Sequence, residues 1–336
     1  MPLHDQVSFN PAVVAYYTGR AIEGFDYGLE DICAVIRQTL DMCFPPSAPR
    51  GIGRWTSEDG FTYRNDNWTT WRVSRPFTDV SGARAWLQRR VEALSQMQVE
   101  PAAARVAYRE KMEALQRLVG DTVICEWSAP GFASMYDAMG LELFVYLCDE
   151  DPQLPLDFME LSTQRELERV AAVADPALSP VILIPDDFAT KQGPIFSPEF
   201  LGMCHFPFVA QLTQAWQQRD VHVLYHSDGN YRKVIPQLIG CGVEGFYCLE
   251  PGVGMEIAGL KREWPRMVWA GGVDGVDLME RGTPEQVRAE VRRQIVETDA
   301  LSGGVFIGTS SEINPPIKVE NFVAMVEAVG ETTHTR

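Results

Sequence analysis

The stretch Val221-His-Val-Leu-Tyr-His-Ser-Asp-Gly-Asn230 shows the pattern that decides the fold class, because a short apolar run ends abruptly in polar residues. Six runs of this kind occur from residue 122 onwards, and amphipathic stretches separate them. Such runs are typical of strands buried in a parallel sheet, and the amphipathic stretches are typical of helices that cover it. The runs are 122–127, 181–185, 221–225, 245–249, 267–270 and 304–307, and the helical stretches are 81–96, 101–118, 198–219, 230–240 and 283–299.

These repeated strand and helix units predict an α/β fold, and their number favours a single (β/α)8 TIM barrel over residues 1–336. An open doubly wound sheet is the alternative. Residues 121–330 contain the regular units, whereas residues 1–120 are expected to form an irregular N-terminal elaboration. Within it, the sequence predicts a β-hairpin that turns at Asp59-Gly60.

The composition argues against several classes of partner. With 29 basic and 46 acidic side chains the formal charge is −17, which repels a nucleic-acid backbone. We find no signal-peptide pattern and no apolar run of about eighteen residues, so we expect a cytoplasmic protein without a membrane partner. The seven cysteines are spread along the chain without a Cys-x-x-Cys pair, which argues against a disulfide framework or a zinc ribbon.

Polar residues follow five consecutive runs, at the strand ends where a β/α barrel places its reactive groups. His226 and Asp228 are two positions apart and can point to the same side, and Glu250 arrives on the next strand. One imidazole and two carboxylates suit zinc, iron or manganese, so we predict a metal site at these three residues. The open alternative is an acid–base pair, or a histidine that only satisfies its own loop.

Asp186 and Asp187 form a second candidate feature after the run 181–185. Repulsion between two adjacent carboxylates raises the pKa of one of them and prepares a proton donor or acceptor. The alternative is a cap for a following turn. The predicted catalytic residues are Asp187, His226, Asp228 and Glu250, and the predicted substrate-binding residues are Asp186, Asn230, Asp274, Ser310 and Glu312.

Six motifs in order resemble the uroporphyrinogen decarboxylase superfamily. They are the stretch from Asp186 to Glu199, His226-Ser-Asp-Gly-Asn230, Glu250-Pro251, Gly271-Gly-Val-Asp274, Gly282-Thr-Pro-Glu285 and Glu320-Asn321. The resemblance covers roughly residues 120–330 and implies a (β/α)8 barrel with a pocket at its C-terminal face. The Arg-Gln-Ala-Gly-Arg segment of the haem-pathway decarboxylases is absent, and only Thr18-Gly-Arg20 is present. The chain therefore looks more similar to the corrinoid-dependent methyltransferase branch.

In that branch zinc is held by a His-x-Cys pair, a later Cys and sometimes a Glu. His226 and Glu250 match this pattern, whereas Asp228 stands in place of the first Cys and Ser311 in place of the second. A histidine and carboxylate site is harder and more Lewis acidic than a thiolate site, and it suits an oxygen or nitrogen donor.

The resemblance thus implies a methyltransferase that moves a methyl group from a small methoxy- or methylamine-type donor to a corrinoid (cobalamin) protein. A divalent metal, zinc in first place, is expected to polarise the leaving heteroatom while Asp187 donates a proton. The second hypothesis is a metal-free decarboxylase in which Asp187 or His226 protonates the carbanion. The third is a barrel that binds a tetrapyrrole or a corrinoid partner without catalysis.

Overall fold

A six-stranded parallel sheet is the centre of the computed structural model, which describes residues 1–66 and 68–331. The strand order is β13-β12-β11-β10-β7-β6, and every pair in it is parallel. Each predicted apolar run overlaps one of these strands, so the α/β fold with a parallel sheet is confirmed. The strands are β6 (Glu126–Trp127), β7 (Val181–Pro185), β10 (His222–His226), β11 (Gly245–Tyr247), β12 (Val268–Val273) and β13 (Val305–Thr309).

N-terminal segments extend this parallel arrangement. β1 (Met42–Cys43) pairs with β5 (Val123–Ile124), which leads through a single residue into β6. Leu3 bridges Ile307 of β13, and its neighbour His4 bridges β1. Main-chain pairing therefore runs from β13 through the N-terminal segment and β1 to β5. The sequence did not predict these pairings, because segments of two residues carry no periodicity.

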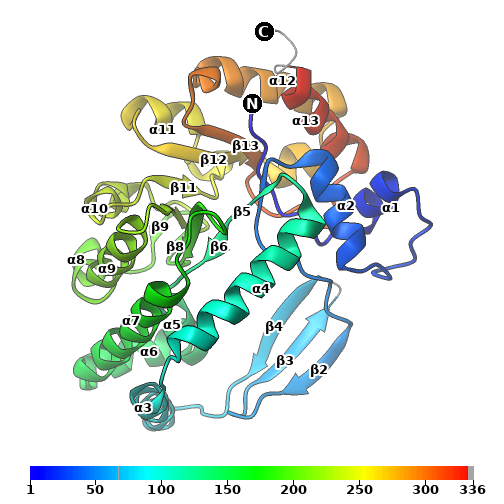
Figure 1. Cartoon of the computed structure of the whole chain (residues 1–336). Coiled ribbons are helices and arrows are strands. Elements are labelled where there is room, and N and C mark those ends of the chain that lie inside the picture. The colour runs from blue at the N-terminus through cyan, green and yellow to red at the C-terminus, as the bar shows by residue number, and fades with distance from the viewer. Residues whose placement is uncertain (67, 332–336) are drawn as a thin grey trace.

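Helices lie around the outside of the strands (Figure 1). The predicted helix 198–219 is divided at His205 into two helices, and the helix predicted at 283–299 begins with the expected capping box at Thr283. The helices are α1 (Pro11–Thr18), α2 (Leu29–Thr39), α3 (Val80–Gln96), α4 (Pro101–Val119), α5 (Phe132–Met139), α6 (Leu141–Glu150), α7 (Gln153–Val173), α8 (Pro198–Cys204), α9 (Phe206–Gln217), α10 (Ile235–Gly240), α11 (Ile257–Glu263), α12 (Pro284–Glu297) and α13 (Val319–Glu331).

A separate antiparallel sheet forms the N-terminal elaboration. It consists of β2 (Gly53–Thr56), β3 (Thr62–Asp66) and β4 (Thr69–Ser74), in that order. The predicted hairpin is present, and Gly60 takes the left-handed conformation that its turn needs, with φ of 89°. The short antiparallel strands β8 (Ala189–Thr190) and β9 (Gly193–Pro194) form a further hairpin, after β7.

The interior contains two clusters of apolar side chains. The larger one lies between strands and helices and includes Ile182 and Ile184 of β7, whereas Leu183, on the opposite face of the same strand, belongs to a smaller cluster. That cluster joins side chains from neighbouring parallel strands: Met42, Phe44, Cys125, Leu183, Leu224, Tyr247, Cys248 and Ala270. The cavity described below is lined by four of these side chains.

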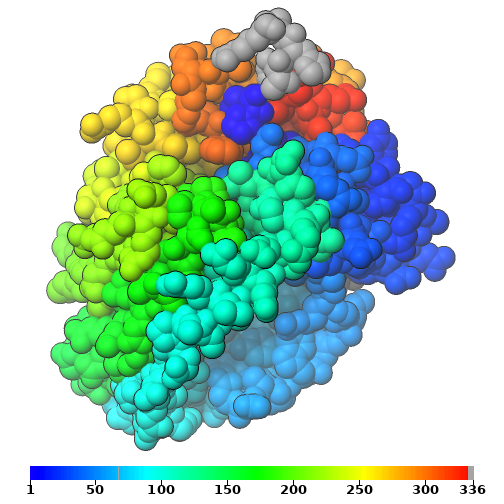
Figure 2. All heavy atoms as spheres, viewed as in Figure 1, coloured from blue at the N-terminus to red at the C-terminus, as the bar shows by residue number. Residues whose placement is uncertain are grey.

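The two ends of the chain meet on one face. In Figure 2 the blue N-terminal residues lie against the orange and red segments near the C-terminus. Asp5 fixes this contact, because its buried carboxylate accepts the main-chain N–H and the hydroxyl of Thr309 at 3.0 Å each. All seven cysteines are free thiols. Among the described residues no helix has both the length and the apolar character needed to cross a membrane.

Candidate functional site

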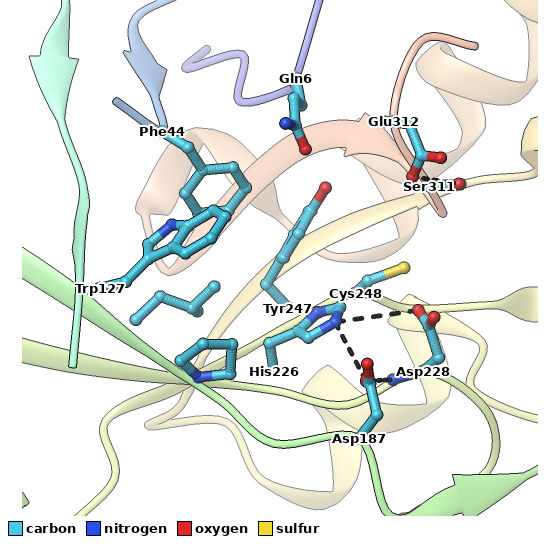
Figure 3. A pocket seen from close by; sticks show the side chains of 12 residues that line it. Gln6, Phe44, Trp127, Asp187, His226, Asp228, Tyr247, Cys248, Ser311 and Glu312 are labelled. Carbon is cyan, nitrogen blue, oxygen red and sulfur yellow. Dashed lines mark hydrogen bonds and ion pairs between the residues drawn. The ribbon is translucent and has the colours of Figure 1, made fainter. Parts of the chain in front are cut away.

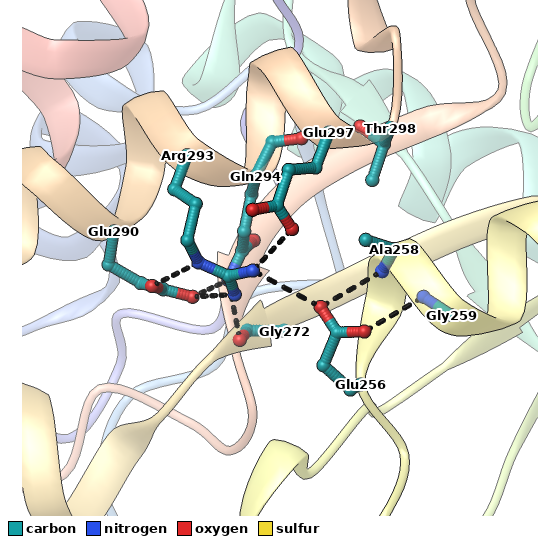
Figure 4. A network of polar contacts seen from close by, with 9 residues as sticks. All are labelled: Glu256, Ala258, Gly259, Gly272, Glu290, Arg293, Gln294, Glu297 and Thr298. Atoms are coloured by element: carbon teal, nitrogen blue, oxygen red, sulfur yellow. Dashed lines mark hydrogen bonds and ion pairs between the residues drawn. The ribbon is translucent and has the colours of Figure 1, made fainter.

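A cavity of about 280 Å³ lies at the carboxyl ends of the parallel strands (Figure 3). Pro185 ends β7, His226 ends β10 and Tyr247 ends β11, and all three line the cavity. This is the position at which a β/α barrel carries its reactive groups. The lining residues are Gln6, Phe44, Trp127, Leu183, Pro185, Asp187, His226, Asp228, Tyr247, Cys248, Ser311 and Glu312.

Three ionisable side chains meet in this cavity. The Nε2 atom of His226 lies 3.3 Å from Oδ1 of Asp187 and 3.9 Å from Oδ1 of Asp228. The main-chain N–H of Asp228 donates to the same Asp187 oxygen at 2.9 Å, which fixes the loop after β10 against the loop after β7. The imidazole is 18% exposed and the two carboxylates are 56% and 64% exposed, so solutes in the cavity can reach them.

The three groups change one another's proton affinity. Burial lowers the pKa of His226, but its hydrogen bond with Asp187 and the charges of Asp187 and Asp228 outweigh burial and raise it above the ordinary value. Burial raises the pKa of Asp187, yet the same partner His226 brings it below the ordinary value. Asp228 behaves differently: burial and the nearby carboxylates raise its pKa to about 6.

These shifts correct the role that the sequence suggested for Asp187. We predicted it as the proton donor, but a carboxyl whose pKa is lowered is ionised at neutral pH and accepts rather than donates. His226, whose pKa is raised, is the better proton carrier. The aspartate of the pair whose pKa rises is Asp186, to about 7, first through burial and then through the charge of Asp187.

Asp186 points away from the cavity. Its side chain is buried, and one carboxylate oxygen accepts the main-chain N–H of Ala133 at the start of α5 at 2.8 Å. The other oxygen lies 3.9 Å from Nε2 of His205, which contacts the hydroxyl of Tyr225 at 2.7 Å. Burial lowers the pKa of His205 to about 3, so this second histidine is neutral. Asp186, predicted to bind substrate, does not line the cavity.

Glu250 is not part of the His226 cluster. The structure groups His226 with Asp228 and Asp187, with ligand atoms within 4.8 Å of one another, rather than with Asp228 and Glu250. The Glu250 carboxylate instead accepts the main-chain N–H of Gly229 at 2.6 Å. The predicted metal ligands therefore meet only in part, and Asp187 takes the place that the sequence gave to Glu250.

Three of the predicted substrate-binding residues hold loops together instead of lining the cavity. Asn230 donates to the main-chain oxygen of Val253 at 2.8 Å. Asp274 caps the π-helical turn 275–280, since its carboxylate accepts two main-chain N–H groups. Ser310 accepts the N–H of Gly275 at 3.0 Å. Glu312, by contrast, lines the cavity and accepts a hydrogen bond from Ser311 at 2.8 Å.

Sequence reasoning missed the uncharged part of the lining, most of all Gln6, Phe44, Trp127 and Tyr247. Trp127 ends the predicted run 122–127, so its position alone was a usable signal, whereas Tyr247 lies in the middle of the predicted run 245–249. Gln6 and Phe44 carried no such signal, because they follow two-residue strand segments in the N-terminal part.

The His226 cluster fits a divalent metal ion. Its potential ligands are one imidazole nitrogen and two carboxylate oxygens, a set that zinc accepts with a position left open. Two ligand atoms at about 2.0–2.1 Å from a tetrahedral zinc ion lie roughly 3.4 Å apart. The separations of 3.3 and 3.9 Å around Nε2 come close to this value without rearrangement of the main chain.

Comparisons with known proteins give a family and a fold. A model of the family described as uroporphyrinogen decarboxylase (URO-D) matches residues 97–332. No curated protein matches the chain in sequence. A methyltransferase from Methanosarcina mazei has a similar structure with a TM-score of 0.65 at 17% identity, over 99% of this chain and 94% of that one.

A second solved structure is the Bacillus subtilis YkuI protein, with an EAL domain, in complex with c-di-GMP and calcium. Its TM-score is 0.32 at 8% identity, over 84% of this chain and 61% of that one, which is too low to support an argument.

Proposed function

Because this chain belongs to the uroporphyrinogen decarboxylase family, we propose that it is a methyltransferase that moves a methyl group from a small methoxy- or methylamine-type donor to a corrinoid protein. The observation that carries the proposal is the meeting of His226, Asp187 and Asp228 in a small cavity at the strand ends. The methyltransferase from Methanosarcina mazei, which shares the fold, supports the type of reaction.

We also infer that the parallel strands form one closed (β/α)8 barrel and that the whole chain is a single domain. The bridges of Leu3 to Ile307 and of His4 to Met42 support closure, because they connect β13 with β1 across the N-terminal segment. The N–H of Cys125 continues this pairing, since it donates to the carbonyl oxygen of Cys43 at 2.8 Å. A closed barrel has one C-terminal mouth, which is where the cavity lies.

We place the metal ion at Nε2 of His226 and the carboxylates of Asp187 and Asp228, with zinc as the first candidate. When bound, such an ion supplies a Lewis acid that polarises a leaving oxygen or nitrogen. Asp187 orients the imidazole, and its own position is set by the N–H of Asp228. Without metal, Nε2 carries a proton that His226 can give to the leaving group, so proton and metal compete for one atom.

The second candidate is a metal-free decarboxylase, which the raised pKa of His226 favours because a protonated imidazole can protonate a carbanion. The negative charge of the cavity argues against the decarboxylase. A carboxylic acid substrate would meet Asp187, Asp228 and Glu312, and repulsion between like charges weakens its binding.

The test is metal content combined with methyl transfer. Protein purified without chelator is expected to contain about one metal ion per chain, and His226→Ala to lose it. His222→Ala is the matched control, because this side chain is 72% exposed and pairs with Glu244 outside the cavity. Wild-type protein should then methylate cob(I)alamin from a methoxy or methylamine donor. Release of carbon dioxide by metal-free protein, with no methyl transfer, would favour the decarboxylase instead.

A further inference from the structure

The cavity has two chemically different sides (Figure 3). Trp127 and Phe44 lie on one side, and Asp187 and Asp228 lie on the other, beyond His226. Glu312 adds a third carboxylate near the segment of Ser311. A substrate in this cavity therefore contacts aromatic rings and carboxylates at the same time.

The aromatic side is a continuous wall. The ring centroids of Trp127 and Phe44 are 5.7 Å apart at an interplanar angle of 74°, and those of Phe44 and Tyr247 are 5.4 Å apart at 62°. Tyr247 in turn lies 5.5 Å from the imidazole of His226. Phe44 and Tyr247 are buried, whereas Trp127 is 47% exposed and offers ring surface to the cavity.

The acidic side lacks compensating cations. Among the described residues that line the cavity, Asp187, Asp228 and Glu312 are acidic, and His226 is the one basic group. No lysine or arginine belongs to this lining. The three carboxylates exceed in charge both the imidazole and a divalent ion held at His226, Asp187 and Asp228, so the cavity attracts positive charge and repels negative charge.

We propose that the methyl donor is a small methylated ammonium cation, held between the aromatic wall and the carboxylates. This inference rests on the proposed methyl transfer, and it favours the methylamine-type donor over the methoxy-type donor. Aromatic rings bind methylated ammonium groups through cation–π attraction, and neighbouring carboxylates strengthen that binding. The cavity of about 280 Å³ restricts the donor to a small molecule, since drug-sized ligands occupy roughly 300–1,000 Å³.

The chemistry of a cationic donor balances without an added proton. The C–N bond breaks, its electron pair stays on nitrogen, and the amine leaves as a neutral molecule. The methyl carbon forms its new bond with the electron pair of cobalt(I) in the corrinoid acceptor. The positive charge on nitrogen makes the amine a better leaving group, as a bound Lewis acid does for the oxygen of a methoxy donor. The neutral product loses the cation–π attraction, which favours its release.

Choline and its neutral carbon isostere 3,3-dimethyl-1-butanol test the proposal, because they have the same shape and differ in charge. Calorimetric titration of the full chain, without acceptor, should show choline binding about tenfold tighter or better. Trp127→Leu should weaken choline binding about 5- to 30-fold and leave the isostere unchanged, and Trp127→Phe should recover much of the loss. Trp71→Leu is the control, since Trp71 is 54% exposed on β4, outside the cavity.

Glu312→Gln gives a second variant that keeps the aromatic wall and the three side chains of the His226 cluster in place, and it should weaken choline but not the isostere. The proposal is overturned if the isostere binds as tightly as choline, if choline does not bind at millimolar concentration, or if Trp127→Leu and Trp71→Leu bind choline equally well. Methyl transfer is measured separately. Transfer from a methoxy donor without cation binding would leave the proposed function intact and overturn the cationic donor. Selective cation binding without any transfer would overturn the proposed function and leave a cation-binding site that is not a donor site.

Discussion

Two pairs, each of one histidine and one aspartate, lie close together near the ends of β7 and β10. One pair favours ionised side chains, and the other favours neutral ones. In the cavity, His226 and Asp187 are 3.3 Å apart, and each favours the ionised form of the other. Behind it, His205 and Asp186 are 3.9 Å apart and fully buried, and burial favours the neutral form of both. The difference shows that access to water and a close partner, rather than residue type, decide which pair carries charge.

The largest expected difference between the two clusters is in activity. His226→Ala should lower methyl transfer by about 10²- to 10⁴-fold, because it removes the group that holds either the proton or the metal. His205→Ala, assayed on folded protein, should stay within about tenfold of wild type, because His205 does not line the cavity. Similar losses in both variants would contradict the assignment of the cavity cluster as the reacting one.

Removal of the histidine should cost more stability in the buried pair than in the cavity pair. His205→Ala removes a buried ring that stacks on Phe132 at 4.8 Å and bonds the hydroxyl of Tyr225. We expect it to lower the free energy of unfolding by roughly 2–4 kcal/mol, as other buried large-to-small changes do. His226→Ala should cost less, since the side chain faces the cavity. Urea unfolding followed by circular dichroism measures the free energy of unfolding of both variants. Equal losses would contradict the difference in burial between the two histidines.

Asp186→Asn should change how stability depends on pH. The folded pKa of Asp186 is raised from 3.8 to about 7, so this carboxyl favours the folded state below pH 3.8 and loses that contribution as the pH rises towards 7. The asparagine variant has no such loss. Its stability relative to wild type should therefore increase over this interval, on the order of 4 kcal/mol. A difference that does not vary with pH would show that Asp186 is not perturbed.

Asp187→Asn should have the smallest effect on stability, because its carboxylate is 56% exposed and water screens its charge. Removal of this partner should lower the pKa of His226, which NMR titration of the ring protons can follow. The pKa of His205 should stay the same, since burial alone accounts for its shift. An unchanged pKa of His226 would mean that Asp187 does not stabilise the protonated imidazole.

Much of the fold was predictable because its signals are local. The runs that became β7, β10 and β13 are short, apolar and bounded by polar residues, and the capping box at Thr283 needs only four consecutive residues. His205 shows the limit of such signals. The helix predicted over 198–219 breaks there, two residues before Pro207, which has no main-chain N–H to donate and lies in the first turn of α9. The imidazole of His205 turns inward to Tyr225 and Asp186. Nothing in the amphipathic pattern of that stretch records this contact.

The candidate site was predictable only in part. Position at strand ends correctly brought His226, Asp228 and Asp187 to one place. It gave Glu250 as the third metal ligand where the structure has Asp187, because the third member depends on how loops from different strands turn. Glu250 is held by the N–H of Gly229, and Asp187 by the N–H of Asp228, so two adjacent amide groups place the two carboxylates.

The sequence by itself determined the parallel α/β architecture, the hairpin near Gly60 and the strand ends at which polar residues gather, since these depend on periodicity and on short motifs. The tertiary structure alone decided the rest. It paired Asp5 with Thr309, 304 positions away, and so brought Gln6 to the cavity. It also raised the pKa of His226 through Asp187 and lowered the pKa of His205 through burial. The reason is physical: proton affinity depends on burial and on partners brought by chain closure, and neither is written in local sequence.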